Sequence, residues 1–322
     1  MKKISVIVPI YNEADGIGLF YSELSQITSE INDYEWEFVF IDDGSSDTSF
    51  RLLKSIADNS PNVKVIRFSR NFGKEIALSA GVQFAQNSVA AICLDADLQH
   101  PPSLIPQFLS KWKAGADIVV GIRAETEDTK LRSIYSSIFH FIFEKLSDID
   151  LPTRATDFCL INDKVIIAFC KLTERERLFR GIISWLGFKK SFVEFKAPAR
   201  FRGESSFSFT KLYSLALNSI TSFSLKPLKF IIYFGTIIST LSALLATWMI
   251  VNYLLKTNFV YTPLAIFMVG NIFISGVIMM FIGILATYVA VIHTEVINRP
   301  LYVITDIVND EDNSFYQNKT LD

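Results

Sequence analysis

The sequence predicts an α/β domain with a mainly parallel sheet, followed by a hairpin of two membrane-spanning helices. Three observations support this prediction. Short apolar runs alternate with segments of helical spacing over the first 125 residues. Two later segments, 230–255 and 257–292, contain no charged residue and no histidine. Polar residues gather directly after several of the predicted strands.

The predicted strands are short runs of apolar and β-branched residues that end at polar or turn-forming residues. In chain order they are 4–8, 37–41, 63–66, 89–94 and 117–120. Their nearly continuous apolar character is typical of strands buried on both faces of a parallel sheet. In such sheets, ligands bind beyond the carboxyl ends of the strands.

The predicted helices lie between these strands. The first has apolar residues at helical spacing, namely Ile17, Phe20, Leu24 and Ile27. The second carries Leu52, Leu53 and Ile56, and Ser46 or Asp47 is expected to cap its start. The third covers 74–85, and the fourth follows two prolines and runs through Leu104, Ile105 and Phe108.

The two charge-free segments are each longer than the roughly 20 residues that a helix needs to cross a bilayer. Buried core helices are the alternative, but such helices seldom run this far without a charge. Pro263 is expected to start the second helix, because proline is tolerated in a first turn. Only 256–262 separates the segments, which predicts a hairpin. Basic residues flank its outer ends, namely Lys226, Lys229 and Arg299.

This distribution of basic residues places the N-terminal part and both chain termini in the cytoplasm. We expect a globular domain at 1–209, an amphipathic juxtamembrane segment at 210–229, membrane helices at 230–292 and a tail at 293–322. The tail is polar and acidic, which is typical of a short docked or disordered end. Segments 131–146 and 210–223 have apolar residues at helical spacing, and each either packs on a core or lies in the headgroup layer.

Composition narrows the class of protein. Half of the 322 residues are hydrophobic and the mean hydropathy is +0.32, so part of the chain is expected in lipid. The net charge of −2 argues against a nucleic-acid partner. The first apolar run stops at Pro9, too early for a signal peptide. The three cysteines have neither metal-site spacing nor a nearby histidine and are expected to be reduced and mostly buried, namely Cys93, Cys159 and Cys170.

Asp95 and Asp97 follow the fourth strand. Alternation along an extended chain would send both carboxylates the same way, toward one point. Two such charges need a cation or hydrogen-bond donors to compensate them, and hard oxygen ligands suit Mg²⁺ or Mn²⁺. The triplet alone also occurs by chance. Asp42 and Asp43 end the second strand similarly, and there a turn with a helix cap is the alternative to a ligand site.

Four ordered motifs make the sequence similar to a known family. They are Pro9-x-Tyr11-Asn12-Glu13, Asp42-Asp43-Gly44-Ser45, Arg70-Asn71-Phe72-Gly73-Lys74 and Asp95-Ala96-Asp97. Their order and spacing resemble the family 2 glycosyltransferases with a GT-A fold. The resemblance is closest to the polyprenyl-phosphate glycosyltransferases. It continues through Asp157-Phe158, Arg177 to Gly181, Trp185-x-Gly187 and Arg202-Gly203-x-Ser205 into the membrane segments, so it covers nearly the whole chain.

The resemblance implies a role for each matching residue. A nucleotide-sugar group would be formed by Pro9, Tyr11, Glu13, Asp43, Asn71, Gly73, Lys74, Asp95 and Ala96. Asp97, with Asp95, would ligate the metal. Asp157 would lie near the sugar and the acceptor phosphate. Arginines and a serine would hold phosphate groups, namely Arg177, Arg180, Arg202 and Ser205; solvated surface charge is the alternative for the arginines.

Two positions depart from the family pattern. His100 stands where the family usually has an acidic residue, and we expect it to be a polar loop residue rather than a ligand. Cys159 stands where the family usually has arginine, which removes one expected phosphate partner. Arg154 is close in sequence and is a candidate to compensate.

The resemblance implies inverting transfer of a hexose, with glucose expected, from a UDP-sugar to undecaprenyl phosphate. It places the enzyme in a bacterial inner membrane, where it would supply lipid-linked sugar for cell-surface glycans. Alternatives are another sugar, such as mannose, an N-acetylhexosamine or an aminoarabinose derivative, and a non-catalytic membrane scaffold. A processive synthase would need a Gln-x-x-Arg-Trp motif and more membrane helices, and a nicotinamide dehydrogenase a glycine-rich first turn. Paired membrane helices also make a homo-oligomer an expectation.

Overall fold

The computed structural model describes residues 1–124, 155–175, 177–196, 248, 251, 263–297 and 299–309. The chain divides into two compact units. The first contains 1–140, 149–206 and 299–322, and the second contains 141–148 and 207–298. Each unit is described separately below.

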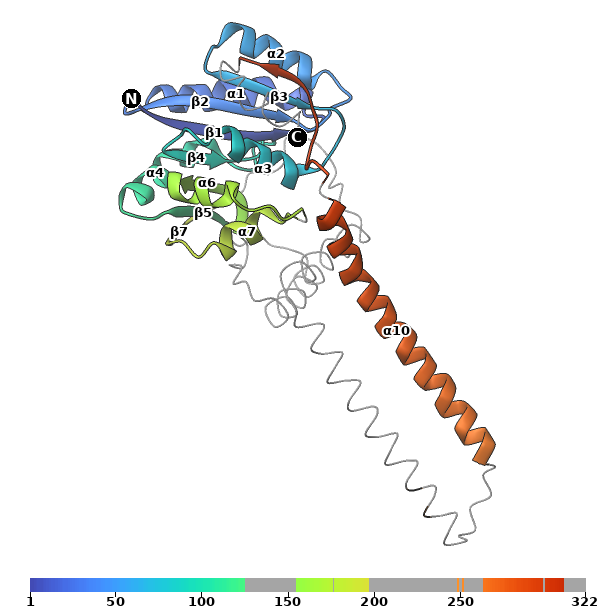
Figure 1. The fold of residues 1–322 in the computed structure, drawn as a ribbon. Coiled ribbons are helices and arrows are strands. Elements are labelled where there is room, and N and C mark those ends of the chain that lie inside the picture. Colours follow the sequence, from blue (N-terminus) through green and yellow to red (C-terminus); the bar gives the residue numbers. More distant parts are fainter. Residues whose placement is uncertain are drawn as a thin grey trace. The chain divides into compact units, whose positions relative to one another are not determined.

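The first unit is built around one sheet of eight strands (Figure 1), in the order β7-β5-β6-β4-β1-β2-β3-β8. The strands are β1 Lys2–Ile10, β2 Tyr34–Asp42, β3 Val63–Phe68, β4 Ala90–Cys93, β5 Ile118–Arg123, β6 Ala155–Asn162, β7 Lys190–Phe195 and β8 Ile304–Val308. Strands β3, β2, β1 and β4 are parallel neighbours, and β7 is parallel to β5. Strand β6 runs antiparallel between β4 and β5. The predicted α/β class with a mainly parallel sheet is confirmed.

Helices connect and cover these strands. They are α1 Ala14–Ser29, α2 Ser49–Asn59, α3 Lys74–Phe84, α4 Ile105–Lys113, α6 Asp163–Cys170 and α7 Phe179–Trp185, with a 3-10 turn η1 at Pro102–Leu104. Asp47 supplies the predicted side-chain bond to the start of the second helix, although it lies one residue before the N-cap position. Thr48 holds the N-cap position of α2 without a side-chain cap bond, while Asp47 Oδ1 accepts the N–H of Ser49, at 2.9 Å, and Asp47 Oδ2 that of Ala14, at 3.3 Å. Asp47 thus joins the start of α2 to the start of α1.

Alternate residues of each central strand face opposite layers. On β2, Phe38 and Phe40 pack in one core with α1, α2 and α4, whereas Val39 and Ile41 pack in another with α3. All four are at most 2% exposed. Burying a large apolar side chain stabilises the fold by roughly 1.5–3 kcal/mol. The near-continuous apolar strands of the sequence therefore reflect helices on both faces of the sheet.

The C-terminal tail contains a strand that the sequence did not predict. β8 pairs antiparallel with β3 and closes that side of the sheet. Just before it, the Tyr302 ring stacks on Phe68 at 4.8 Å and its hydroxyl donates to Gln83 Oε1 at 2.6 Å. Just after it, Asn309 Nδ2 donates to the carbonyl oxygens of Ala57 and Val63, at 2.7 and 3.1 Å. This part of the tail is docked.

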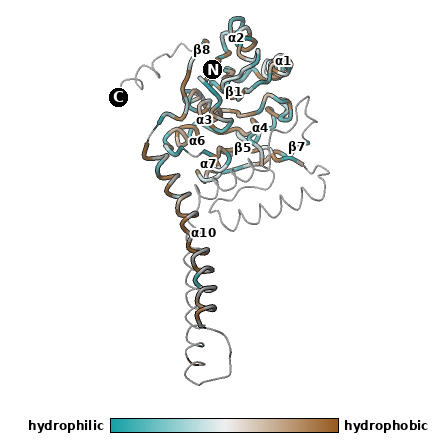
Figure 2. The backbone as a smooth tube through the Cα atoms, turned by 90° about the vertical axis from the view of Figure 1, so that its right-hand side faces the viewer, coloured by the Kyte–Doolittle hydropathy of each residue, from teal (hydrophilic) through white to brown (hydrophobic). Residues whose placement is uncertain are grey.

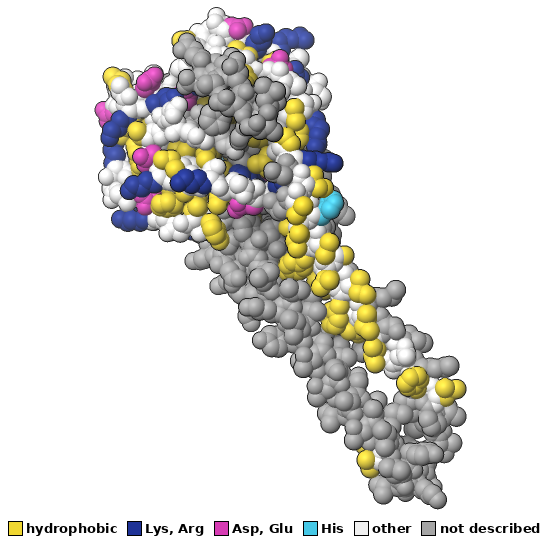
Figure 3. Space-filling model, in the orientation of Figure 1, with side chains coloured by type: hydrophobic (Ala, Val, Ile, Leu, Met, Phe, Trp, Pro, Cys, Tyr) yellow, Lys and Arg dark blue, Asp and Glu magenta, His cyan; other side chains and the backbone are white. Residues whose placement is uncertain are grey.

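The described part of the second unit is mainly α10, Pro263–Ile297. It starts at the proline where the sequence predicted a helix to begin. Hydrophobic residues run along it (Figure 2). Large apolar side chains stand exposed on it (Figure 3), among them Leu264, Phe267, Ile278, Ile282 and Leu285. Among the described residues, no helix combines the length and apolar character needed to cross a membrane.

The membrane hairpin therefore stays a prediction. Its first expected helix, 230–255, lies outside the described residues except for Trp248 and Val251. The amphipathic segments 131–146 and 210–223 also lie outside them.

Candidate active site

Three parallel strands bring polar loops to one edge of the sheet. Ile10 and Asp42, the last residues of β1 and β2, lie side by side in the register. Beyond them the loops are tied together, because Asp43 N–H donates to the Ile10 carbonyl at 2.8 Å and Asn12 N–H donates to Ser45 Oγ at 3.0 Å. Asn12 itself has φ of 55°, a left-handed conformation that turns the chain sharply after β1. The motifs after the first two strands thus form one surface.

Of the predicted nucleotide-sugar group, Pro9, Tyr11 and Glu13 lie at this end of β1. The Tyr11 side chain stands free of the core, with 47% exposure. The Glu13 backbone N–H donates to Ser49 Oγ at 3.0 Å, which fixes the loop against the start of α2. The three residues therefore line the approach to the edge of the sheet where β1 and β2 end.

Asp43 holds the loop that precedes α3. Its two carboxylate oxygens accept the N–H groups of Phe72, at 2.7 Å, and of Gly73, at 2.9 Å. Burial raises the pKa of Asp43, and these two hydrogen bonds oppose the increase. Gly73 has φ of 102°, which favours glycine, and Asn71 beside it is exposed. The structure therefore brings Asp43, Asn71 and Gly73 together, as expected from the resemblance.

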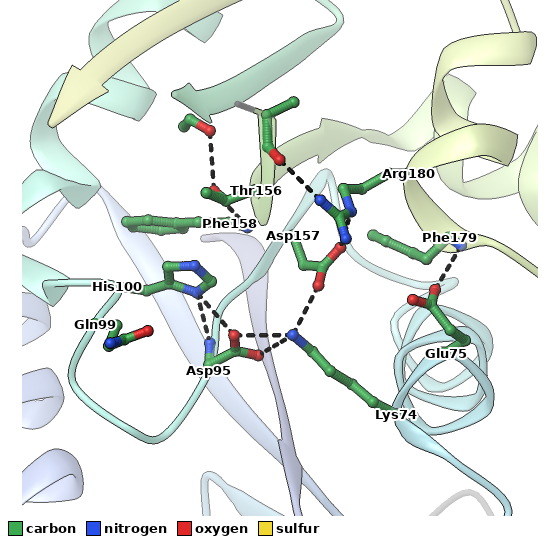
Figure 4. Close-up of polar contacts among 12 residues, drawn as sticks. Lys74, Glu75, Asp95, Gln99, His100, Thr156, Asp157, Phe158, Phe179 and Arg180 are labelled. Carbon is green, nitrogen blue, oxygen red and sulfur yellow. Dashed lines mark hydrogen bonds and ion pairs between the residues drawn. The ribbon is translucent and has the colours of Figure 1, made fainter. Parts of the chain in front are cut away.

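A chain of alternating charges lies beside this loop (Figure 4). Lys74 Nζ is 2.7 Å from Asp95 Oδ1 and 2.7 Å from Asp157 Oδ2. Arg180 Nε is 2.9 Å from Asp157 Oδ1, and Arg180 Nη1 donates to the Ala155 carbonyl at 2.9 Å. Four predicted site residues from α3, the end of β4, β6 and α7 therefore form one cluster.

The register of β4 and β6 explains why Asp95 and Asp157 meet. Cys93 pairs with Cys159 across these antiparallel strands. Asp95 lies two residues after Cys93, and Asp157 lies two residues before Cys159. The register, continued past the end of β4, therefore brings Asp95 opposite Asp157. The sequence did not predict β6, so it gave no geometric reason for this meeting.

The cluster fixes the charges of its members. Burial raises the pKa of Asp157, but Lys74 and Arg180 outweigh it and lower that pKa to about 2. Burial lowers the pKa of Lys74, but Asp95 and Asp157 outweigh it and raise that pKa. At neutral pH, Asp157 is an anion between two cations. It is poorly suited to act as a general base because a carboxylate with so low a pKa holds a proton only weakly at neutral pH.

His100 is buried rather than solvated. Its side chain is 2% exposed, and its ring stacks on Phe158 at 5.3 Å and meets Phe195 edge-on at 6.1 Å. Its Nδ1 accepts the Asp95 backbone N–H at 3.1 Å, an arrangement that requires the proton of a neutral ring to sit on Nε2. Burial lowers the pKa of His100, which favours this neutral form. The residue expected to be a polar loop side chain thus anchors the backbone of Asp95.

Asp97 lies in a turn rather than on an extended strand. β4 ends at Cys93, Ala96 and Asp97 form a turn, and Leu98 has φ of 60°. The strand alternation expected to aim Asp95 and Asp97 alike therefore does not reach them. Asp97 Oδ1 instead accepts the Gln99 N–H at 3.0 Å, while Ala96 is 3% exposed.

The donor set of this loop fits a hard divalent cation. Within the described residues no group of three or more His, Cys, Asp or Glu side chains is placed to hold a metal. Two carboxylates, Asp95 and Asp97, are present, and Mg²⁺ is commonly held by one or two carboxylates together with substrate phosphates. These two residues would hold such an ion only together with a bound diphosphate.

The remaining predicted residues lie elsewhere. Arg177 is 8% exposed, and its guanidinium donates to the carbonyls of Leu172 and Glu174, at 2.6 and 2.9 Å, in the loop between α6 and α7. These bonds hold Arg177 to the loop before α7. Arg202, Ser205 and Arg154 lie outside the described residues. All three cysteines are free thiols, and Cys93 and Cys159 are buried, as predicted.

Comparisons with known proteins agree with this geometry. The family model described as Glycosyl transferase family 2 matches residues 5–175. An uncharacterized glycosyltransferase of Synechocystis sp. is 36% identical over 95% of this chain and 95% of its own. The bactoprenol glucosyl transferase of Shigella phage SfII is 38% identical over 94% of this chain and 97% of its own. A prophage bactoprenol glucosyl transferase homolog of Escherichia coli is 36% identical over 94% of this chain and 98% of its own.

Proposed function

Since the chain belongs to glycosyl transferase family 2 and is therefore an enzyme of sugar transfer, we propose that it moves a hexose from a UDP-sugar to a polyprenyl phosphate. Glucose and undecaprenyl phosphate are the proposed sugar and acceptor. Relatives named for glucosyl transfer to bactoprenol support both choices, because each aligns with the chain over nearly its whole length.

The observation that carries this proposal is the cluster of Lys74, Asp95, Asp157 and Arg180 next to the Asp43 loop. A sugar-nucleotide donor presents a base and ribose, then a diphosphate, then a sugar. The polar edge offers the exposed Tyr11 and the loop held by Asp43 for the first part, and Lys74 for the second. Arg180 and Asp157 lie farther along the same chain of contacts, on the side proposed for the sugar and the acceptor phosphate.

The reaction is a single displacement at the anomeric carbon. An oxygen of the acceptor phosphate forms the new bond to that carbon, the bond to the donor diphosphate breaks, and UDP leaves with the electron pair; the configuration inverts. The second pKa of a phosphate monoester is near 6, so the attacking oxygen is already largely anionic at pH 7. No proton has to be removed from it, which agrees with an Asp157 already engaged by two cations.

Charge and alignment therefore supply the catalysis. Lys74, whose pKa is raised, remains a cation that can contact the leaving diphosphate. Arg180 orients Asp157 through its Nε and stays anchored to the Ala155 carbonyl. A Mg²⁺ or Mn²⁺ ion bound at Asp95 and Asp97 would add neutralisation of the diphosphate charge.

We also propose that 230–255 and 257–292 anchor the enzyme in a bacterial inner membrane, with the sheet unit and both termini in the cytoplasm. Their lack of charge supports this, as do the exposed apolar side chains along α10. Nucleotide sugars are cytoplasmic, and a polyprenyl phosphate presents its headgroup at the membrane surface. The product would be a lipid-linked sugar for modification of cell-surface glycans, and self-association of the anchors is part of this proposal.

The test uses the purified full-length protein in detergent micelles. Undecaprenyl phosphate is supplied with a panel of UDP- and GDP-hexoses, UDP-N-acetylhexosamines and an aminoarabinose donor, and the lipid product is weighed by mass spectrometry. We expect one hexosyl unit per lipid with UDP-glucose, loss of product with a chelator, and recovery with Mg²⁺ or Mn²⁺.

Asp97→Asn is expected to lower the rate at least about 100-fold, because it removes a charged ligand from the diphosphate site. Asp33→Asn is the matched control, since Asp33 is a surface carboxylate, 69% exposed, whose 2.9 Å ion pair is with Lys113 at the protein surface. A wild-type rate in folded Asp97→Asn protein would contradict the metal role. A polymeric product would favour a processive synthase, and no product with any donor would favour a scaffold.

A further inference from the structure

Glu75 is a partly buried carboxylate next to the site that none of the roles above uses. It is the second residue of α3, directly after Lys74. Its Oε2 accepts the backbone N–H of Phe179 at 2.6 Å, across 104 positions of sequence (Figure 4). This contact joins the helix that carries Lys74 to the start of α7.

The bond satisfies a helix end that lacks a cap of its own. Phe179 is the first residue of α7, and the N-cap residue Leu178 makes no side-chain cap bond. The first N–H groups of a helix have no partner within it and need one from elsewhere. Phe179 is also fully buried, and its ring meets Phe169 of α6 at 5.5 Å. Glu75 and the aromatic packing together fix where α7 begins.

The residue after Phe179 is the one that matters for the site. Arg180 contacts Asp157 Oδ1 through Nε, while Lys74 contacts Asp157 Oδ2. Two neighbouring residues of α3 therefore reach the same carboxylate by two routes. Lys74 does so directly, and Glu75 does so through the backbone of Phe179 and the side chain of Arg180.

The same helix is attached to the donor side. The loop before α3 is held by Asp43 through the N–H groups of Phe72 and Gly73. A continuous set of short contacts thus runs from Asp43, through the start of α3 and Glu75, to Arg180 and Asp157. The donor loop and the proposed acceptor side are connected through Glu75.

A negative charge is not what this position favours. Burial raises the pKa of Glu75 to about 7, and the nearby Asp157 anion adds to the increase, against the Phe179 N–H, Arg180 and Lys74. The side chain can accept the Phe179 hydrogen bond through an oxygen in either protonation state. Substitutions can therefore test the hydrogen bond from Phe179 and the negative charge of Glu75 independently.

We propose that Glu75 is a positioning residue that sets Arg180, and through it Asp157, by holding the first N–H of α7. This inference rests on the proposed function, because its readout is sugar transfer. It predicts that the length and acceptor oxygen of the side chain matter, and that its charge does not.

Three variants of the full-length enzyme separate these properties. Glu75→Gln keeps the length and an acceptor oxygen without the charge, and we expect kcat within about threefold of wild type. Glu75→Asp keeps the charge but is one methylene too short, and Glu75→Ala removes both. For these two we expect kcat to fall about tenfold or more, as slight misplacement of reacting groups does, with KM for the donor within about twofold.

A double-mutant cycle with Arg180→Ala tests the route. If Glu75 acts through Arg180, then Glu75→Ala in the Arg180→Ala background lowers kcat by less than about twofold further. Additive losses would overturn the proposal. So would an active Glu75→Asp beside an inactive Glu75→Gln, because that pattern would make charge the essential property.

Controls keep the outcome decisive. Glu35→Ala, at an exposed position of β2, reports on removal of a carboxylate without this contact. Melting temperatures accompany each assay, and if Glu75→Ala does not fold, the comparison of Glu75→Gln with Glu75→Asp still decides. An inactive wild type would count against the proposed function, whereas an active wild type with fully active Glu75→Asp and Glu75→Ala would count against Glu75 alone.

Discussion

Lys74 lies within ion-pair distance of two carboxylates that come from distant parts of the sequence. Its side chain is 41% exposed, and an isolated pair at that exposure would contribute little to stability. Asp157, however, is only 8% exposed and also faces Arg180. Removing either cation would leave a mostly buried carboxylate with half of its compensation, so the cluster acts as one unit.

The pH dependence of stability offers a residue-scale prediction at Glu75. Its pKa is about 7 in the folded protein and ordinarily 4.5, so the folded state binds more protons between these values. Stability contributed by the protonated carboxyl is present below about pH 4.5 and is lost as pH rises through 7. Glu75→Gln removes this loss, which is on the order of 2 kcal/mol after allowance for partial exposure.

We therefore expect Glu75→Gln to raise the melting temperature at pH 8 by more than it does at pH 5. The measurement is thermal unfolding of the full-length protein in detergent at both pH values, with Glu35→Gln as the exposed control. An equal change in melting temperature at the two pH values would contradict the prediction that ionised Glu75 destabilises the folded protein at pH 8.

Among the elements, β8 is a short strand that holds β3 in place, although the two are far apart in the sequence. Ser69 N–H, directly after β3, donates to the Val303 carbonyl at 2.9 Å, and the loop that Asp43 holds begins one residue later. β8 therefore steadies β3 where it leads into the donor loop. Asn309 completes this attachment by donating to carbonyls at the end of α2 and the start of β3.

Asn309 adopts φ of 59°, a left-handed conformation. Two substitutions therefore distinguish the contribution of its backbone conformation to stability from that of its side-chain hydrogen bonds. Asn309→Ala loses the hydrogen bonds and places a Cβ in a left-handed conformation, and we expect a loss of about 1–3 kcal/mol. Asn309→Gly loses the same bonds without that strain, and should lose less. Chemical denaturation midpoints measure both. A variant with alanine as stable as wild type would contradict the docking of this residue.

Particular elements show what the sequence could predict. Strands β1 to β5 were predicted because each is a compact apolar run followed by turn residues, and the site at their carboxyl ends followed from that arrangement. Strands β6, β7 and β8 were not predicted. The pairing of these strands depends on tertiary contacts, and the five residues of β8 have no distinctive pattern. The place of Asp157 opposite Asp95 could not be found for the same reason.

The sequence also did not predict side-chain contacts between residues that lie far apart along the chain. Lys74, Asp95, Asp157 and Arg180 were singled out by motif resemblance, yet nothing in their spacing indicated that one lysine would bridge two of the acids. Nothing in the sequence distinguishes Glu75 from an ordinary glutamate in a first helical turn. Only the position of α7 reveals its partner.

For the whole molecule, the proposal of a membrane anchor makes a direct prediction. The full chain, expressed in a bacterium, should sediment with membranes and stay there after washing with alkaline carbonate, because apolar spans of this length leave lipid only with detergent. A chain in which a flexible linker replaces residues 230–292 keeps β8 on the sheet, is the comparison, and should be released by the same wash. Complete release of the full chain would contradict the anchor.

The return of the chain to the sheet has a consequence for the order of synthesis. Residues 299–322 belong to the same compact unit as residues 1–140. A ribosome therefore exposes β1 to β7 well before β8 is made, and until then β3 has one row of unpaired backbone groups. Such an edge can pair with other nascent chains. β8 is the strand that shields this edge, so the sheet unit is completed only after the chain has been made as far as residue 308.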